Sequence, residues 1–314
     1  MKKSSLFACL LAIAGLLSLL TTSGAARLVV FGDSLSDNGN TFAAVGLPQP
    51  PYYQGRWTNG PNWVDYFTGL ALLPPTTAYL QDRGTNFAVG GSSSPFLAAQ
   101  IGIYLATNGG RANLDDLFVI WIGANDFRAG VDWSTTVDSI QTGLALLGAA
   151  GAQSVILLDV PDISLTPEVI STGGSNVQAA KQFVATVNGN LQSRVPLEAL
   201  LLGVRLTYVD VNAIFAQIIQ RPAAFGFSNS TGAAFNSSTG IVQPNPNSYV
   251  FWDGFHPTTP AHQIAAQTVW ARVNAPSTFL RLHGVLKRGS SRFGLDRIRL
   301  SSYHSLRGSL PGRF

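Results

Sequence analysis

Cysteine is almost absent from this chain, and its absence excludes several kinds of chemistry. The single cysteine is Cys9, which lies within the first 26 residues. The remaining residues therefore cannot form disulfide bonds, thiolate metal sites or a cysteine nucleophile. Histidine is also scarce, with four residues in the whole chain. A general base that works near neutral pH is most often histidine, so these few residues are the first candidates for catalysis.

Charged side chains are scarce as well. Asp, Glu, Lys and Arg make up 11% of the chain, against about 25% in typical soluble domains. Gly, Ser, Thr and Asn take their place, which favours an extracellular protein over a cytosolic one. Hydrophobic residues make up 46% of the chain, enough for one large core in a single domain.

The first 26 residues have the pattern of a secretory signal peptide. Two lysines form a basic start, an apolar run extends from Leu6 to Leu20, and small residues from Thr21 to Ala26 offer a cleavage site. The alternative is an uncleaved membrane anchor, but the run is shorter than the roughly 20 residues that span a bilayer. We therefore expect residues 1–26 to be removed and the protein to be secreted or periplasmic.

Charge is distributed unevenly along the chain. Residues 27–275 contain ten Lys or Arg against fifteen Asp or Glu, whereas residues 276–314 contain eight against one. The acidic main part does not suggest a partner among nucleic acids. The basic C-terminal segment shows no sustained helical or strand period. We therefore expect residues 276–314 to be a disordered tail that makes at most weak contact with anionic surfaces.

Short apolar segments alternate with helical patterns between residues 27 and 275. Nearly continuous apolar strands are typical of a mainly parallel sheet that is covered on both faces, in one doubly wound α/β domain. The expected strands are 27–31, 117–122, 154–160 and 205–209, and the expected helices include 98–107, 131–150, 177–202, 211–220 and 259–273. We also expect Pro196 to break the long helix and residues 225–248 to form a loop.

The region around His256 is a candidate for acid–base chemistry. In doubly wound sheets the active site lies beyond the carboxyl ends of the strands, and polar clusters at 32–40, 123–126 and 252–256 fit that position. Asp253 lies three residues before His256, so its carboxylate can reach Nδ1, fix the tautomer and stabilise the imidazolium. The alternative is an ordinary loop in which Asp253 caps the next helix and His256 is merely exposed. The local sequence leaves both interpretations open.

Ser34 is the candidate nucleophile. It follows the first expected strand at a turn, where its hydroxyl would lie at the top of the sheet beside helical N–H groups. The alternative is that Ser34 only caps a helix, a position that serine favours. The chain lacks the Gly-x-Ser-x-Gly sequence of one large class of serine hydrolases, so a different serine-hydrolase arrangement has to be considered.

Four sequence blocks, in the expected order, resemble those of the SGNH (GDSL) hydrolase family. They are Gly32–Leu35 (GDSL), Asn86–Gly91 (NFAVGG), Gly123–Asp126 (GAND) and Asp253–Pro257 (DGFHP). The resemblance covers roughly residues 27 to 273. Two longer stretches, 31–40 and 53–65, are similar to the larger bacterial and plant-like members, which are grouped with lipases, phospholipases and haemolysin-type acyltransferases. The resemblance implies a three-layer α/β/α sandwich with a mainly parallel, flavodoxin-like sheet.

The resemblance also implies a role for each matching residue. Ser34 matches the nucleophile, His256 the general base and acid, and Asp253 the residue that orients the imidazole. Three donors match the oxyanion hole, namely the backbone N–H groups of Ser34 and Gly91 and the side-chain amide of Asn125. Gly90 is the alternative to Gly91, because the glycine doublet makes the alignment ambiguous.

Together these features predict a serine ester hydrolase that cleaves lipid or short-chain acyl esters through an acyl-enzyme on Ser34. The sequence has no metal-ligand spacing, phosphate loop or dinucleotide fingerprint, so we expect no metal and no cofactor. Carbohydrate deacetylation and acyl transfer to an alcohol other than water are alternatives on the same fold. An inactive secreted surface-binding protein is an alternative of a different class. The intact Ser34, Asn125, Asp253 and His256 argue against it.

We predict that the chain cut after Ala275 is folded and active. The four blocks and the last expected helix end before residue 276, and the tail cannot easily offset an ordering entropy of about 1–2 kcal/mol per residue. Melting temperature, ester turnover and retention on anionic vesicles would be compared for residues 27–275 and 27–314. Only the longer chain should show salt-sensitive retention. Unfolding on truncation would place the tail within the domain, and unchanged retention at low salt would exclude it as the adhesive element.

Overall fold

The computed structural model describes residues 27–275. The predicted signal peptide, residues 1–26, and the predicted disordered tail, residues 276–314, lie outside the described residues. Within the described range, no helix is both long and apolar enough to cross a membrane.

The core of the fold is a sheet of four parallel strands in the order β1-β2-β3-β4. The strands are β1 (Leu28–Gly32), β2 (Leu117–Trp121), β3 (Ser154–Leu158) and β4 (Arg205–Val209), and every pair runs parallel. These ranges confirm the four expected strands to within one or two residues. All five residues of β1 are buried between the helical layers, as expected for an inner parallel strand.

A fifth, irregular segment extends the sheet beyond β1. Residues 85–89 run along the free edge of β1, where the N–H of Phe87 donates to the carbonyl of Val30 (2.7 Å) and the N–H of Val30 donates to the carbonyl of Thr85 (3.0 Å). With this segment counted second along the chain, the spatial order is 2-1-3-4-5. That is the flavodoxin-like order, so the predicted fold class is confirmed.

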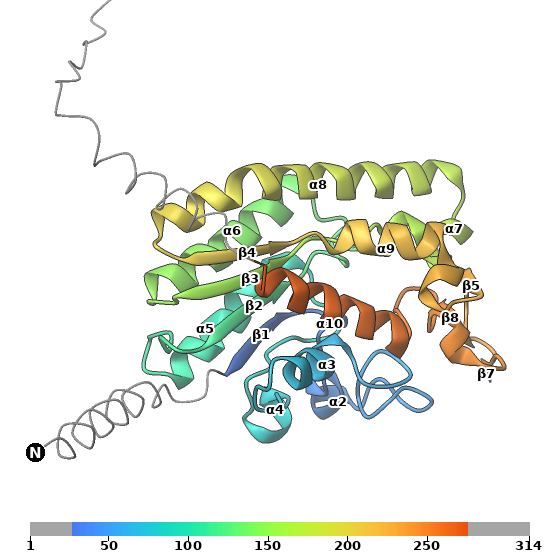
Figure 1. Ribbon diagram of the computed structural model, residues 1–314, viewed down its shortest axis with the longest axis horizontal. Helices are drawn as coiled ribbons and strands as arrows, with labels where there is room; N and C mark the ends of the chain where they lie inside the picture. The colour runs from blue at the N-terminus through green and yellow to red at the C-terminus, as the bar shows by residue number, and fades with distance from the viewer. Residues whose placement is uncertain (1–26, 276–314) are drawn as a thin grey trace, which may run out of the picture. The chain divides into compact units, whose positions relative to one another are not determined.

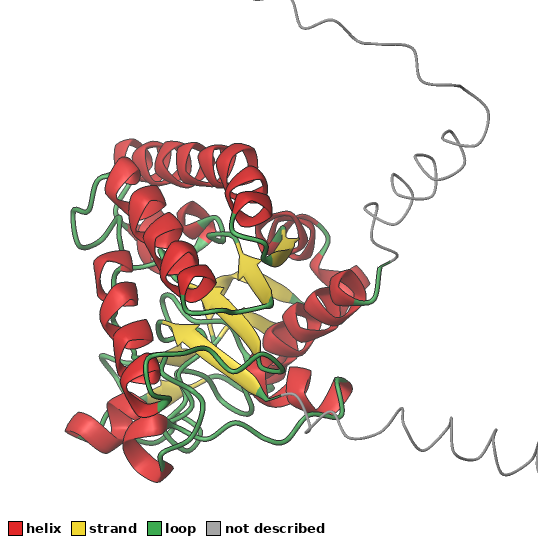
Figure 2. Cartoon of the chain, turned by 90° about the vertical axis from the view of Figure 1, so that its left-hand side faces the viewer, coloured by secondary structure: helices red, strands yellow, loops and turns green. Residues whose placement is uncertain are grey.

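Helices cover both faces of the sheet (Figure 2). α5 (Leu97–Thr107), α6 (Trp133–Ala149) and α8 (Gly174–Leu201) pack side by side in one layer. α3 (Trp63–Leu70) and α10 (Thr259–Val273) pack against each other in the opposite layer, and α9 (Val211–Gln220) contacts α10 (Figure 1). The remaining helices are short, namely α2 (Asn40–Val45), α4 (Tyr79–Asp82) and α7 (Pro167–Ser171). The predicted three-layer sandwich is therefore confirmed.

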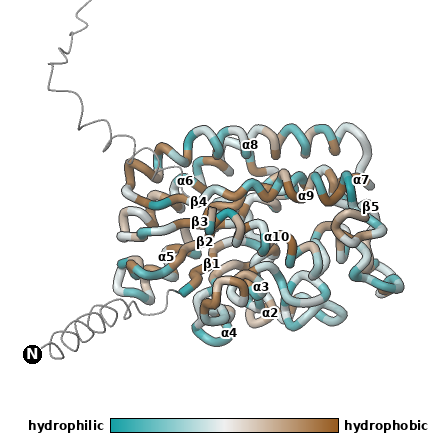
Figure 3. Tube along the Cα trace, in the orientation of Figure 1, coloured by the Kyte–Doolittle hydropathy of each residue, from teal (hydrophilic) through white to brown (hydrophobic). Residues whose placement is uncertain are grey.

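The long helix α8 continues through Pro196, so the predicted break at this residue is wrong. Proline removes one backbone hydrogen bond, to the carbonyl four residues earlier. That residue, Gln192, is exposed, so water can satisfy its carbonyl. Val195 and Ala199 bury their side chains on either side of the proline, and this packing holds the helix together. Figure 3 shows hydrophobic and hydrophilic positions alternating along α8, as expected for a helix with one buried face.

Residues 225–248 are more ordered than the predicted loop. β5 (Asn229–Ala233) pairs in parallel with β8 (Tyr249–Phe251), and β6 (Phe235–Asn236) pairs with β7 (Ile241–Val242) as a hairpin. The side chain of Asn236 accepts hydrogen bonds from two backbone N–H groups in the hairpin turn. Local polar contacts of this kind leave no hydrophobic pattern in the sequence. β6, β7 and β8 have only two or three residues, too few to show a period, and the sequence of β5 (NSTGA) has no apolar alternation, which is why this prediction was wrong.

Candidate functional site

The loop after β1 begins at the place where the sheet reverses its order, since residues 85–89 lie on one side of β1 and β2 on the other. Crevices at such places are the usual ligand sites of doubly wound sheets. At Gly32 a Cβ atom would lie 2.3 Å from the carbonyl oxygen of Trp121, so no larger residue fits there. The side-chain amide of Gln100 bonds to both the N–H and the carbonyl of Gly32 at 2.8 Å. The base of the Ser34 loop is therefore fixed.

Asp37 holds the Ser34 loop in shape. Its carboxylate accepts hydrogen bonds from the backbone N–H groups of Gly39 (2.8 Å), Asn40 (2.7 Å) and Thr41 (3.1 Å). It also accepts the N–H of Gly90 (2.9 Å), which belongs to the second sequence block. Asp37 therefore connects the first two blocks through hydrogen bonds that are all internal to the protein.

Ser34, His256 and Asp253 form a continuous hydrogen-bonded array. Nε2 of His256 lies 2.9 Å from Oγ of Ser34, and Nδ1 of His256 lies 2.7 Å from Oδ2 of Asp253. All three side chains are buried, and the hydroxyl of Ser34 faces a cavity. This geometry does not fit the two alternative interpretations, in which Ser34 is only a helix cap and His256 is merely exposed.

Asp253 is held as a carboxylate. Its Oδ1 accepts the backbone N–H groups of Phe255 (2.8 Å) and His256 (2.7 Å), and the hydroxyl of Tyr52 donates to Oδ2 (2.6 Å). Burial raises the pKa of Asp253, but the neighbouring His256 and these hydrogen bonds outweigh burial and lower the pKa to about 2. Burial, followed by the charge of Asp253, raises the pKa of Tyr52, which therefore keeps its proton and acts as a donor.

Aromatic rings enclose the imidazole of His256. The ring of Trp57 lies 5.3 Å away, tilted by 31°, and the ring of Phe255 meets the imidazole edge-on at 5.6 Å. The loop itself is anchored because the hydroxyl of Thr58 donates to the carbonyl of Pro257 (2.8 Å). The imidazole therefore has little freedom to rotate away from Ser34.

Gly91 and Asn125 lie beside Ser34, whereas Gly90 is occupied elsewhere. The N–H of Gly90 bonds to Asp37 and to the hydroxyl of Thr41 (2.7 Å), so it points into the protein. Gly91 has a φ of 80°, in the left-handed region that favours glycine, and it lines the same cavity as Ser34. The side-chain amide of Asn125 donates one N–H to the carbonyl of Ser92 (3.0 Å). Its second N–H has no hydrogen-bond partner among residues 27–275.

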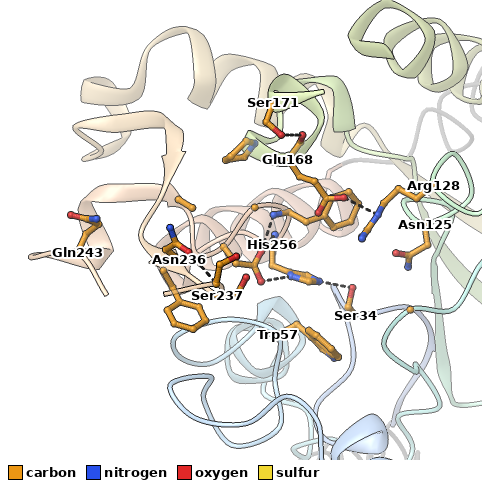
Figure 4. Close-up of a pocket in the computed structure, with 18 residues that line it drawn as sticks. Ser34, Trp57, Asn125, Arg128, Glu168, Ser171, Asn236, Ser237, Gln243 and His256 are labelled. Carbon is orange, nitrogen blue, oxygen red and sulfur yellow. Dashed lines mark hydrogen bonds and ion pairs between the residues drawn. The ribbon is translucent and has the colours of Figure 1, made fainter. Parts of the chain in front are cut away.

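The cavity above Ser34 has a volume of about 780 Å³. All five predicted site residues line it, namely Ser34, Gly91, Asn125, Asp253 and His256. Figure 4 shows Ser34 and Arg128 on one side of the His256 imidazole and, on the other side, residues from the β6–β7 region, namely Asn236, Ser237 and Gln243. The cavity therefore has two sides that differ in lining and that meet at His256.

Several residues of the site were not identified from the sequence. Trp57 lies within the 53–65 stretch that carries part of the family resemblance, so that stretch was the available signal. Arg128 and Glu168 form an ion pair at 3.0 Å at the cavity wall. Arg128 lies in the turn after β2 and Glu168 in α7, far apart in the sequence, and no motif connects them. The other histidine of the described range, His262, does not line the cavity; burial lowers its pKa to about 3.

A Ser–His–Asp array at the carboxyl edge of a parallel α/β sheet is the arrangement of a serine hydrolase. Residues 28–269 match the family described as GDSL-like Lipase/Acylhydrolase. The chain therefore belongs to this family, as its four sequence blocks predicted. At the level of the family, this confirms the prediction of a carboxylic ester hydrolase, and the relatives also include a protein named as an acyltransferase.

Three curated relatives have different names. The phosphatidylcholine-sterol acyltransferase of Aeromonas hydrophila is 29% identical over 74% of this chain and 72% of that protein. The acetylesterase of Thermothelomyces thermophilus is 27% identical over 81% of this chain and 94% of that protein. Lipase 1 of Photorhabdus luminescens is 27% identical over 88% of this chain, which spans 54% of that longer protein. Among solved structures, a variant of an acetyl-xylooligosaccharide esterase from Geobacillus has 16% identity and a TM-score of 0.47, and the match covers 81% of this chain and 96% of that chain.

Asp33, which precedes Ser34, is fully buried beneath the site. Burial raises the pKa of its carboxyl to about 7. Hydrogen bonds from the backbone N–H groups of Leu35 and Ala124 favour the charged form and oppose this rise. In the unfolded chain an aspartate titrates near pH 3.9. Between these two values the folded protein binds more protons than the unfolded one, so this group's stabilisation is complete below about pH 4 and is lost as the pH rises through about 7.

We predict that Asp33→Asn reduces this loss of stability. The amide keeps an acceptor for the Leu35 N–H and cannot ionise. Melting temperatures would be measured at pH 5 and pH 8 for the wild type, for Asp33→Asn and for Asp82→Asn, in which an exposed carboxyl is replaced. The drop in melting temperature from pH 5 to pH 8 should be smaller in Asp33→Asn than in the other two proteins. Equal drops in all three would show that Asp33 does not titrate in this range.

Proposed function

We propose that this protein hydrolyses acyl esters through an acyl-enzyme formed on Ser34. The observation that supports this proposal is the unbroken array from Asp253 through His256 to Ser34, at the floor of a cavity of about 780 Å³. Family membership supports the same reaction class, ester hydrolysis or acyl transfer.

The reaction proceeds in two halves. His256 Nε2 accepts the proton of Ser34 Oγ as the oxygen attacks the carbonyl carbon of the ester, and the imidazolium then gives that proton to the leaving alcohol oxygen. Asp253 holds the Nδ1 proton and stabilises the imidazolium without taking the proton itself. In the second half, His256 activates a water molecule that attacks the acyl-enzyme, and the acid and free Ser34 are released.

Three donors stabilise the oxyanion of each tetrahedral intermediate, namely the N–H of Ser34, the N–H of Gly91 and the amide of Asn125. Gly91 takes this role rather than Gly90, because the N–H of Gly90 is already bonded to Asp37 and Thr41. These donors are fixed before the substrate binds, so they need no reorganisation during the reaction. One such donor contributes about 2.7–4 kcal/mol to transition-state stabilisation.

Acyl transfer or carbohydrate deacetylation is a second candidate. The observation that favours it is the set of amide and hydroxyl side chains on the far side of His256, where Asn236, Ser237 and Gln243 line the cavity. Groups of this kind bind a polar alcohol, which could be the leaving group of an ester or the acceptor of an acyl group. The names of the acyltransferase and acetylesterase relatives are consistent with both reactions.

We also propose that the protein acts outside the cytoplasm. The N-terminal signal-peptide pattern and the small fraction of charged residues support this location. An inactive binding protein is the alternative of a different class. It would hydrolyse no ester, so an ester-hydrolysis assay distinguishes it from the proposed function.

We predict that Ser34→Ala abolishes hydrolysis and leaves the fold intact. Loss of the nucleophile should lower kcat for p-nitrophenyl butyrate by on the order of 10⁴-fold or more, because no other group can form the acyl-enzyme. Ser193→Ala, which removes an exposed serine hydroxyl on α8 that does not line the cavity, is the matched control and should keep most of the activity. A fluorophosphonate probe should label Ser34 alone. Activity of Ser34→Ala near that of the wild type would rule out Ser34 as the nucleophile.

A further inference from the structure

A second, smaller cavity lies behind one wall of the first. Its volume is about 30 Å³, close to that of one water molecule, and its lining is mostly apolar, with Leu35, Ile163, Phe215 and Phe251 among the side chains. Phe255 lines both cavities, and within residues 27–275 it is the one residue that does so. The aromatic ring of Phe255 therefore separates the ester-binding cavity from an apolar space.

Contacts on several sides hold Phe255 in this position. The guanidinium of Arg128 lies over the ring, 4.8 Å from its centroid, and Glu168 holds Arg128 through the 3.0 Å ion pair. The N–H of Glu168 donates to the carbonyl of Gly254 (2.8 Å), so α7 is tied directly to the loop that carries Phe255. The backbone N–H of Phe255 bonds to Asp253, and this bond does not depend on the side chain.

The proposed chemistry determines which part of the ester faces Phe255. His256 gives its proton to the leaving alcohol, so the alcohol part extends beyond the imidazole, toward the polar side chains of Asn236 and Gln243 (Figure 4). The acyl part then extends to the opposite side, where Arg128 lies over Phe255. An acyl chain that grows in this direction meets the Phe255 ring.

We propose that Phe255 sets the length of acyl chain that the site can bury, by closing the apolar cavity behind it. This inference rests on the proposed acyl-ester hydrolysis and names the residue that selects among acyl esters. Each methylene group moved from water into an apolar cavity favours binding by about fourfold. With Phe255 in place, methylene groups beyond the first few stay in the open cavity and gain less than this.

The experiment compares kcat/KM for p-nitrophenyl butyrate and p-nitrophenyl laurate. Phe255→Ala joins the two cavities, so the laurate-to-butyrate ratio should rise by about tenfold or more relative to the wild type. Phe255→Leu removes less volume and should raise the ratio by a smaller factor, and it decides the question if the alanine variant does not fold. Melting temperatures show which variants are folded.

Two further variants separate this role from a general effect on the site. Phe235→Ala removes an aromatic ring from the wall on the other side of His256, does not touch the apolar cavity, and should leave the ratio unchanged. Ile219→Trp in the Phe255→Ala background puts a larger side chain into the lining of the apolar cavity and should cancel the gain on laurate.

The outcomes distinguish this inference from the proposed function. An unchanged ratio in both Phe255 variants, with Ser34-dependent hydrolysis of butyrate, would overturn the role of Phe255 and leave the ester hydrolase in place. A gain on laurate that persists after Ile219→Trp is added to Phe255→Ala would overturn it too, since the chain would then bind elsewhere. If the wild type hydrolyses neither ester, the proposed function itself is wrong.

Discussion

The hydrogen bond between Oγ of Ser34 and Nε2 of His256 joins residues that lie 222 positions apart in the chain. It forms only if the loop after β1 and the loop before α10 meet at the same edge of the sheet. β1 is fixed between β2 and residues 85–89, and α10 is fixed against α3 in the layer above. The α/β domain between the two loops therefore determines the distance of 2.9 Å between Ser34 Oγ and His256 Nε2.

Residues 58–60 anchor the end of the loop that carries His256 and the first residue of α10. The hydroxyl of Thr58 donates to the carbonyl of Pro257, and Oδ1 of Asn59 accepts the N–H of Thr259 (2.9 Å). At Gly60 a Cβ atom would lie 2.7 Å from the side chain of Thr259, so a larger residue would push the segment away. This segment belongs to the 53–65 stretch that resembles larger family members. Its contacts fix where the His256 loop ends and α10 begins.

The sequence predicted the four strands and five of the residues that line the cavity, because both depend on short, local patterns. Apolar runs of five or six residues and the four blocks need no knowledge of distant contacts. The course of α8 through Pro196 could not be predicted, because it depends on which face of the helix is buried. The choice between Gly90 and Gly91 depends on the bonds from Gly90 to Asp37 and Thr41, which only the folded chain brings together.

The Arg128–Glu168 pair and the β6–β7 hairpin were missed for a different reason. Neither belongs to a block. Glu168 reaches the cavity because α7 is bonded to the loop that carries His256, and the hairpin does so because the N–H of Phe235 donates to the carbonyl of Trp252 (2.6 Å). Sequence patterns therefore identify the groups proposed for the chemistry better than the groups proposed for substrate choice. The two sets also differ physically.

Four of the groups assigned to the chemistry, Ser34, Asn125, Asp253 and His256, are buried and hydrogen-bonded within the protein. Asp126, the neighbour of Asn125, is fully buried as well, and its carboxylate accepts hydrogen bonds from the hydroxyls of Ser94 and Thr136. An unpaired polar group at such a depth would be costly, so each substitution there affects several partners at once. Arg128 and Glu168 are about two-fifths exposed, and their ion pair is screened by solvent. Substitutions in this part of the cavity wall should therefore affect stability little, whereas substitutions in the hydrogen-bonded array beneath it should affect stability strongly. Different substrates can then be accommodated around one unchanged reaction.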